Sequence, residues 1–163
     1  MSILDIPPFL ATRRNHAVEH ATLKVLARKY EDKNLAGHSN PTGFFLFGDL
    51  AMNDIRSAVD EAMTRLRAGE RDLAIHPGCG TNMATSMILP ASFAWIPFQS
   101  TRSFRWRLVL IPVALMFAAF GYLLSRPLGP WMQRNVTTEA NLGDLQLVDI
   151  VRVRKGMYRV ITK

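Results

Sequence analysis

The stretch Asn15-His16-Ala17-Val18-Glu19-His20-Ala21-Thr22 lies within a run from Thr12 to Tyr30 whose apolar residues recur at helical spacing. In a helix, His16, Glu19 and His20 occupy positions i, i+3 and i+4, so two imidazoles and one carboxylate share a face. The order H-x-x-E-H is that of the inverzincin motif, in which two histidines hold zinc and the glutamate acts on bound water. The stretch therefore predicts a metal-binding helix. The alternative is a surface helix on which these residues are only hydrated.

A zinc site needs a third protein ligand, and His76 and Cys79 offer one at H-x-x-C spacing. The alternative for this pair is a strand end followed by a buried thiol at the start of an apolar helix. Cys79 is the only cysteine, which excludes an internal disulfide and fits a reducing compartment. Near a histidine it could also be a nucleophile. His38, in a turn, and Glu139, at an expected helix start, are weaker candidates.

Two stretches without Asp, Glu, Lys or Arg interrupt the second half of the chain, from Leu73 to Thr101 and from Leu108 to Ser125. A helix that spans a bilayer needs about 20 mostly apolar residues. We therefore expect a transmembrane helical hairpin, with a loop that carries Arg102, Arg105 and Arg107.

The remaining residues predict an α+β fold. After an extended lead-in over Ile3 to Phe9 and the helix from Thr12, we expect a β-hairpin in Leu35 to Asp49. A second helix, capped by Asn53 or Asp54 and ended by Gly69, and a short strand over Leu73 to His76 follow. The Val-rich and Ile-rich tail from Leu147 to Thr162 predicts two more strands that turn at Lys155-Gly156, after a helical turn over Thr137 to Glu139.

We accordingly expect three parts: a soluble α+β domain with the metal motif over residues 1–82, a transmembrane helical hairpin over 83–125, and an interfacial segment with a β-hairpin tail that packs on the soluble domain over 126–163. Met1 to Leu10 shows no secretory signal, so the soluble domain is expected on the cytoplasmic side of the inner (cytoplasmic) membrane. The arginines of the hairpin loop conflict with this topology by the positive-inside rule.

The net charge of +7 suits an anionic lipid leaflet, and no nucleic-acid motif accompanies it, so the expected partner is the lipid bilayer. A membrane protein complex is a second possible partner, and nucleic acid is not expected.

Three blocks of sequence together resemble a known family. They are Asn15-His16-Ala17-Val18-Glu19-His20, His76-Pro77-Gly78-Cys79-Gly80-Thr81-Asn82 and Pro130-Trp131-Met132-Gln133-Arg134-Asn135-Val136-Thr137-Thr138. Their order is similar to that of the YqhQ-like bacterial membrane proteins, described as predicted metal-dependent enzymes, or of a shorter sister family. The resemblance implies that His16, Glu19, His20, His76 and Cys79 act as one site. The chain departs from the larger relatives because it has no membrane helices before the histidine helix.

The first hypothesis is a membrane-anchored, zinc-dependent hydrolase in which His16 and His20 hold zinc with His76 or Cys79. Glu19 would be the general base. Trp131, Gln133 and Arg134 are candidate substrate-binding residues, and the substrate would be a membrane peptide or a lipid ester. The alternative hypothesis is a non-catalytic membrane subunit or assembly factor with a structural His/Cys zinc site.

Overall fold

The structure is a computed structural model that describes residues 3–163 and divides into two compact units. The first unit comprises residues up to His76 together with Arg134–Lys163. The second unit comprises Pro77–Gln133. The chain therefore leaves the first unit after His76 and returns to it at Arg134.

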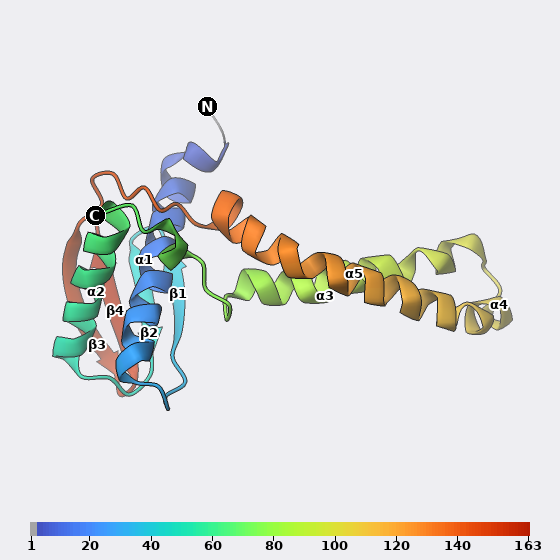
Figure 1. Cartoon of the computed structure of the whole chain (residues 1–163), viewed down its shortest axis with the longest axis horizontal. Coiled ribbons are helices and arrows are strands. Elements are labelled where there is room, and N and C mark those ends of the chain that lie inside the picture. The colour runs from blue at the N-terminus through green and yellow to red at the C-terminus, as the bar shows by residue number, and fades with distance from the viewer. Residues whose placement is uncertain (1–2) are drawn as a thin grey trace. The chain divides into compact units, whose positions relative to one another are not determined.

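The first unit is an α+β fold of two helices on one face of an antiparallel sheet (Figure 1). The helices are α1 (Pro7–Lys29) and α2 (Met52–Arg67). The strands are β1 (Ala36–Asn40), β2 (Gly43–Phe47), β3 (Leu147–Arg154) and β4 (Met157–Thr162), in the order β1-β2-β4-β3. The expected α+β class is thus confirmed, and the tail joins the sheet of the first unit as β3 and β4.

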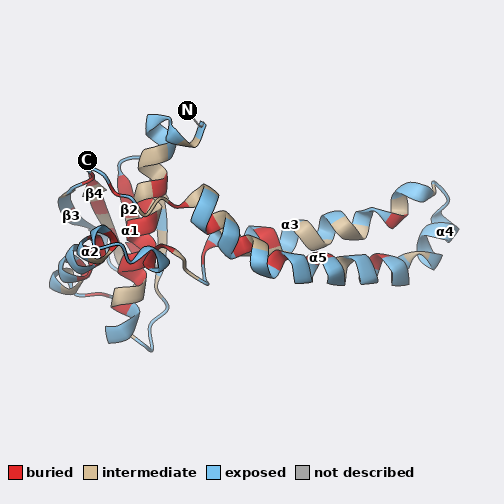
Figure 2. Ribbon diagram, turned by 45° about the horizontal axis from the view of Figure 1, so that its top comes forward, coloured by how far each residue is buried: buried red, intermediate tan, exposed pale blue. Residues whose placement is uncertain are grey.

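The core of this unit lies between the helices and the sheet (Figure 2). Because side chains alternate across a strand, Phe44 and Leu46 of β2 are buried while Phe45 and Phe47 face the other side. Val160 of the neighbouring β4 is fully buried beside them. The helices contribute the remaining apolar surface, so α1 is covered along its middle and exposed at its ends.

Both predicted β-hairpins are confirmed. Asn40 pairs with Gly43 across the first turn, and Arg154 pairs with Met157 across the second. Gly156 has φ +72, a left-handed conformation that favours glycine and fits the expected turn at Lys155-Gly156.

Four local predictions are wrong. The lead-in is a 3-10 turn, Ile3–Asp5, and α1 already begins at Pro7, because proline suits the first turn of a helix. Helix α2 is preceded by Ala51, with no side-chain cap from Asn53 or Asp54.

The predicted strand over Leu73 to His76 is instead the 3-10 helix η2 (Arg71–Ala74), which buries Leu73 and Ala74. The expected helical turn over Thr137 to Glu139 lies one turn earlier, as the π-type turn η4 (Gln133–Thr137). The predicted stop of α2 is confirmed by Gly69, with φ +95.

The second unit is a helical hairpin of α3 (Gly80–Trp95) and α5 (Ile111–Met132), which run side by side in opposite directions (Figure 1). Between them lie the 3-10 turn η3 (Pro97–Ser100) and the short helix α4 (Phe104–Val109). Helix α5 continues beyond Ser125, the expected end of the hairpin, and runs through Pro127 and Pro130 to Met132. An interfacial location of the segment from residue 126 on stays a prediction. The rings of Phe93 and Phe120 meet across the pair at a centroid distance of 5.7 Å.

Small residues line the contact between α3 and α5. Gly121, Ser125 and Gly129 recur every fourth position of α5 and are buried. A Cβ at Gly121 would lie 3.0 Å from the carbonyl oxygen of Leu89, so the two backbones approach closely. Small residues at every fourth position are typical of helices that pack in membranes.

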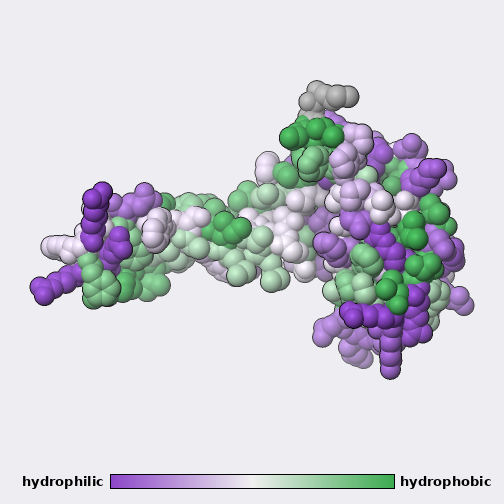
Figure 3. Space-filling view, turned by 180° about the vertical axis from the view of Figure 1, so that it is seen from behind, coloured by the Kyte–Doolittle hydropathy of each residue, from purple (hydrophilic) through white to green (hydrophobic). Residues whose placement is uncertain are grey.

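On the face of the hairpin that Figure 3 shows, apolar residues predominate and strongly hydrophilic residues gather at the α4 end. Among the described residues, one helical segment, Ile111–Thr137, is long and apolar enough to cross a membrane by length and composition. Helix α3, with 16 residues, is shorter than that segment. The helical hairpin is therefore observed, while a double crossing of the membrane stays a prediction.

Candidate metal centre

His16 and His20 lie one turn apart on α1, and their ring centroids are 4.2 Å apart at an interplanar angle of 61°. Helix α1 is the central helix of the first unit, so His20 is only 1% exposed and His16 is half-buried. The shared face that the i, i+4 spacing predicts is therefore present.

His20 is held in one tautomer by the backbone. Its Nδ1 lies 2.6 Å from the carbonyl oxygen of Ala74. Because a carbonyl only accepts hydrogen bonds, Nδ1 must carry the proton, which leaves a lone pair on Nε2. This Nε2 is buried and has no hydrogen-bond partner among residues 3–163. An unsatisfied buried nitrogen costs about 1–3 kcal/mol, and a bound metal ion would remove that cost.

His16 is oriented by a backbone carbonyl in a similar way. Its Nδ1 lies 2.9 Å from the carbonyl oxygen of Thr137. The proton again belongs on Nδ1, and Nε2 keeps the lone pair. Histidines that ligate metals commonly donate their second ring N–H to a backbone carbonyl in this way. Two neighbouring imidazoles therefore both present Nε2 as a ligand atom.

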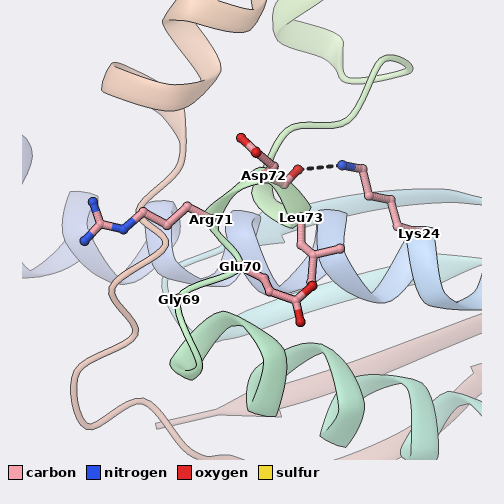
Figure 4. A pocket seen from close by; sticks show the side chains of 6 residues that line it. All are labelled: Lys24, Gly69, Glu70, Arg71, Asp72 and Leu73. Atoms are coloured by element: carbon pink, nitrogen blue, oxygen red, sulfur yellow. Dashed lines mark hydrogen bonds between the residues drawn. The ribbon is translucent and has the colours of Figure 1, made fainter.

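The segment that carries the Ala74 carbonyl is held against α1 by a lysine. Lys24 of α1 donates from Nζ to the carbonyl oxygen of Asp72 at 2.6 Å, so η2 is fastened across α1 (Figure 4). Partial burial lowers the pKa of Lys24, and the charge of Asp72 opposes that shift. The contact places Ala74, two residues further on, against His20.

The segment that carries the Thr137 carbonyl is held against α1 by an arginine. Arg13 is 9% exposed and donates from Nε to Val136 at 2.8 Å and from a terminal nitrogen to Thr138 at 3.1 Å, in both cases to the carbonyl oxygen. The same guanidinium lies 3.5 Å from the carboxylate of Glu139. Segment 135–139 is thus held along α1, and the structure gives Glu139 an ion pair with Arg13.

Glu19 faces the sheet. Its side chain is 4% exposed and accepts a hydrogen bond from the hydroxyl of Ser39 on β1. A Cβ at Gly37 would overlap the carboxylate, so only glycine leaves room for it there. Glu19 is therefore a buried, hydrogen-bonded carboxylate next to the two histidines in sequence.

Asn15 connects α1 to the sheet through hydrogen bonds. It is fully buried, donates from Nδ2 to the carbonyl oxygen of Asn40 at 2.9 Å, and accepts from the hydroxyl of Thr162 at 2.7 Å. The sequence did not predict these roles of Asn15, Arg13, Ser39 or Gly37. Only Asn15 could have been suspected from the sequence, because it is a polar residue immediately before the histidine motif.

His76 ends the first unit, with its ring centroid 5.5 Å from that of His20. It thus extends the imidazole pair to a group of three within this unit. His38 is exposed on β1 and pairs in register with Phe45, whose side chain lies on the sheet face away from the helices.

Cys79 belongs to the second unit, where it caps α3 and its Sγ accepts from the backbone N–H of Thr81 at 3.4 Å. Only Pro77 and Gly78 separate it from His76 in the chain, so the Cα atoms of His76 and Cys79 lie within about 11 Å. His16, His20 and Cys79 together are a set of side chains that could hold a metal ion. Zinc binds both imidazole and thiolate readily.

The three predicted substrate residues have different surroundings. Trp131 is 56% exposed near the end of α5. Gln133 is fully buried and donates to the side-chain oxygen of Asn82 at 2.7 Å within the hairpin unit. Arg134 returns the chain to the first unit and lies 2.8 Å from the carboxylate of Asp72.

A cleft of about 570 Å³ opens beside Arg134 in the first unit. It is lined on one side by Arg71, Asp72 and Ala74 and on the other by the segment that contains Thr138 and Glu139. Ala74 and Thr138 also border the contacts that orient His20 and His16. The cleft therefore adjoins the backbone supports of the histidine pair.

The first unit thus defines an α+β protein with a paired-histidine site of the kind that binds metal ions. The chain belongs to the family described as Domain of unknown function (DUF6391), whose model matches residues 11–150. It is 35% identical over 153 residues to an uncharacterised protein of Picosynechococcus sp., with 83% of this chain and 71% of the relative covered. No solved structure matches the chain. Neither the family nor the relative concerns YqhQ-like proteins, so that resemblance stays a prediction.

Proposed function

We propose that this protein is a membrane-anchored, zinc-dependent hydrolase. The observation that carries the metal site is the tautomer of the two histidines, since both Nδ1 atoms face backbone carbonyls and Nε2 of His20 is buried without a partner among residues 3–163. This arrangement is what a metal-ligating histidine needs.

The proposed ligands are His16, His20 and Cys79. Two imidazoles and one thiolate are three good zinc ligands, and a catalytic zinc site keeps a fourth position for water. The partial positive charge at the start of α3 favours a thiolate at its N-cap. Zinc bound there would act as a Lewis acid that activates water for hydrolysis near neutral pH.

Glu19 is the proposed general base. Its carboxylate would accept a proton from water, and the hydroxyl of Ser39 would hold the carboxylate in place while it does so. Substrate would enter through the cleft of the first unit, where Arg71 and Arg134 suit an anionic or strongly polar group. A membrane peptide and a lipid ester both remain consistent with such a cleft.

The hairpin is the proposed membrane anchor. Helix α5 has 22 residues, so it is about 33 Å long, close to the roughly 30 Å hydrocarbon thickness of a bilayer. Its exposed side chains are large and apolar, as lipid-facing residues are. We propose that α3 crosses with it in the inner membrane and that both ends of the chain stay on the cytoplasmic side.

A non-catalytic membrane subunit with a structural zinc site is the second candidate. The observation that favours it is the environment of Glu19, which accepts from Ser39 and packs against Gly37 as a structural carboxylate does. In this case His76, 5.5 Å from His20 by ring centroid, would complete a four-ligand site.

The test begins with the metal content of the full chain purified in detergent without chelators. We expect about one zinc per chain, and less than about 0.2 for His20→Ala and Cys79→Ala. His38→Ala is the matched control, because this exposed histidine lies outside the site, and it should keep zinc. A wild-type chain that binds no zinc would overturn both candidates.

Glu19→Gln then separates the two candidates, because glutamine keeps the shape and can still accept from Ser39. A hydrolase should keep its zinc and lose about 10²–10⁴-fold in turnover on a panel of lipid esters and peptides. A structural site predicts unchanged zinc and unchanged cellular phenotype. It also predicts that His76→Ala lowers zinc content, which the three-ligand catalytic site does not.

A further inference from the structure

The hairpin unit contains a polar groove that the proposed hydrolase does not use. It has a volume of about 400 Å³ and lies between the first turns of α3 and the last turns of α5. Its polar lining comes from Asn82 and Ser86 of α3 and from Tyr122, Ser125 and Arg126 of α5. Polar side chains therefore gather at one place on a hairpin whose exposed large side chains are mostly apolar.

Arg126 is the one charged residue between Leu108 and Gln133, and α3 carries none. Within the part of the chain that the structure describes, Arg126 forms no ion pair. Charged residues within membrane segments are costly and usually mark a functional contact with an ion, a substrate or a lipid. The guanidinium offers five N–H donors and no acceptor, so its natural partner is an anion.

Tyr122 precedes Arg126 by four positions, so both side chains lie on the same face of α5. Its hydroxyl forms no hydrogen bond among residues 3–163, and the residue is 50% exposed. The hydroxyls of Ser86 and Ser125 donate to backbone carbonyls of their own helices. The guanidinium of Arg126 and the phenol of Tyr122 are therefore the groups at the groove that can donate hydrogen bonds to a ligand.

The position of Arg126 along α5 indicates which kind of anion could reach it. It lies 15 positions beyond Ile111, or about 22 Å along the axis of α5, where a long side chain can reach the headgroup layer of a bilayer that α5 spans. Nearer to α4, the exposed residues of the hairpin are apolar, for example Met87 and Phe120. A ligand with a phosphate at one end and hydrocarbon chains at the other matches both features. Basic pockets between membrane helices bind lipid headgroups in this way.

We propose that the groove of Arg126 and Tyr122 binds the headgroup phosphate of an anionic phospholipid. This inference rests on the membrane anchor of the proposed function and not on zinc or catalysis. Arg126 donates two hydrogen bonds to phosphate oxygens, and Tyr122 donates one.

The test is native mass spectrometry of the full chain in detergent, titrated with phosphatidylglycerol or phosphatidylcholine. We expect preferential binding of phosphatidylglycerol and about a tenfold loss of its affinity in Arg126→Gln, since a charge-assisted hydrogen bond is worth about 1.5 kcal/mol or more. Tyr122→Phe should lose about threefold. Circular dichroism checks that the variants keep their helices.

Arg102→Gln is the matched control, because Arg102 lies before α4, outside the groove. An equal loss in Arg102→Gln would show that overall charge binds the lipid and would overturn the proposal. Displacement of the lipid by millimolar inorganic phosphate would also overturn it, since the groove would then bind a free anion.

Flotation with vesicles distinguishes this inference from the membrane anchor. A chain that floats with vesicles but binds both lipids equally retains the anchor and contradicts the groove. A chain that does not float overturns the anchor and the groove together, whatever its zinc content.

Discussion

Helices α1 and α5 have nearly the same length, 23 and 22 residues, and opposite patterns of burial. In α1 the buried residues include polar side chains, among them Asn15, Glu19 and His20. In α5 the large apolar side chains are exposed, and the buried positions are Ala114, Gly121, Ser125 and Gly129 (Figure 2). The first pattern suits a helix surrounded by protein and water, and the second suits a helix surrounded by lipid.

The two burial patterns also leave different side chains available for binding. Polar groups buried in α1 are fixed by hydrogen bonds from η2, β1, β4 and the segment 135–139, which orients their remaining atoms. Helix α5 packs through backbone proximity, so its side chains are free to contact what surrounds the hairpin. The proposed metal site therefore uses oriented side chains of α1, and the proposed lipid groove uses exposed side chains of α5.

The largest effect is expected from shortening a leucine in each helix. Leu26 of α1 is 2% exposed, so Leu26→Ala should lower the free energy of unfolding of the first unit by about 2–5 kcal/mol. Leu115 of α5 is 65% exposed, and Leu115→Ala should change stability by about 0.5 kcal/mol or less. Amide hydrogen exchange in detergent, resolved by segment, measures both.

Equal losses in the two variants would contradict the contrast, because they would mean that Leu115 is buried against other parts of a protein assembly. Leu123→Ala, at a second exposed position of α5, repeats the comparison.

A smaller effect is expected when a large side chain replaces one of the small residues of α5 that contact α3. The Cβ of a residue at position 121 would lie 3.0 Å from the Leu89 carbonyl oxygen and 3.0 Å from Cα of Pro90, and backbone atoms cannot rotate away. Gly121→Leu should therefore destabilise the packing of α3 on α5 by about 1–3 kcal/mol. Thermal unfolding followed by circular dichroism in detergent measures the loss. Ala119→Leu, on the exposed side of α5, should have no such effect.

Much of the first unit could be predicted from local signals. The helical spacing of α1 and the turn residues of both hairpins depend on neighbours in sequence, and these elements are where the pattern places them. The apolar run Leu73 to Ile75 is too short to distinguish a strand from a turn of helix, and here the prediction is wrong. Pro127 and Pro130 indicate a helix end, but α5 continues through both. Membrane helices tolerate proline more often than soluble ones.

The candidate metal site also has one part that the sequence predicted and one part that it could not predict. The i, i+4 spacing correctly places the imidazoles of His16 and His20 on one face. The carbonyls that set their tautomers come from Ala74 and Thr137, which are 54 and 121 positions away. Contacts at such separation depend on the tertiary fold, so the sequence could suggest ligands but could not show which ring nitrogen faces the metal.

The smallest effect concerns the solvated end of α1, which contrasts with the nearly uncharged α5. There Asp54 of α2 accepts hydrogen bonds from Lys29 and Tyr30, and these two donors, Lys29 first, hold the pKa of the Asp54 carboxyl below its usual value. A carboxyl with a lowered folded-state pKa stabilises the fold fully above its unfolded pKa, about 3.9. That contribution is lost as the pH falls through the lower, folded-state value.

Asp54→Asn should therefore reduce stability slightly at neutral pH and remove part of the decline in stability below about pH 4. The effect should be small and weaker in high salt, because the carboxyl is only half-buried at the protein surface, where water and ions screen it. Hydrogen exchange of α1 and α2 amides between neutral and acidic pH measures it. Asp60→Asn, at an exposed position of α2 without an ion pair among the described residues, is the control and should keep the wild-type profile. If both variants follow the wild-type curve, the contact of Lys29 and Tyr30 with Asp54 does not stabilise the end of α1, and the contrast with α5 is limited to the middle of the two helices.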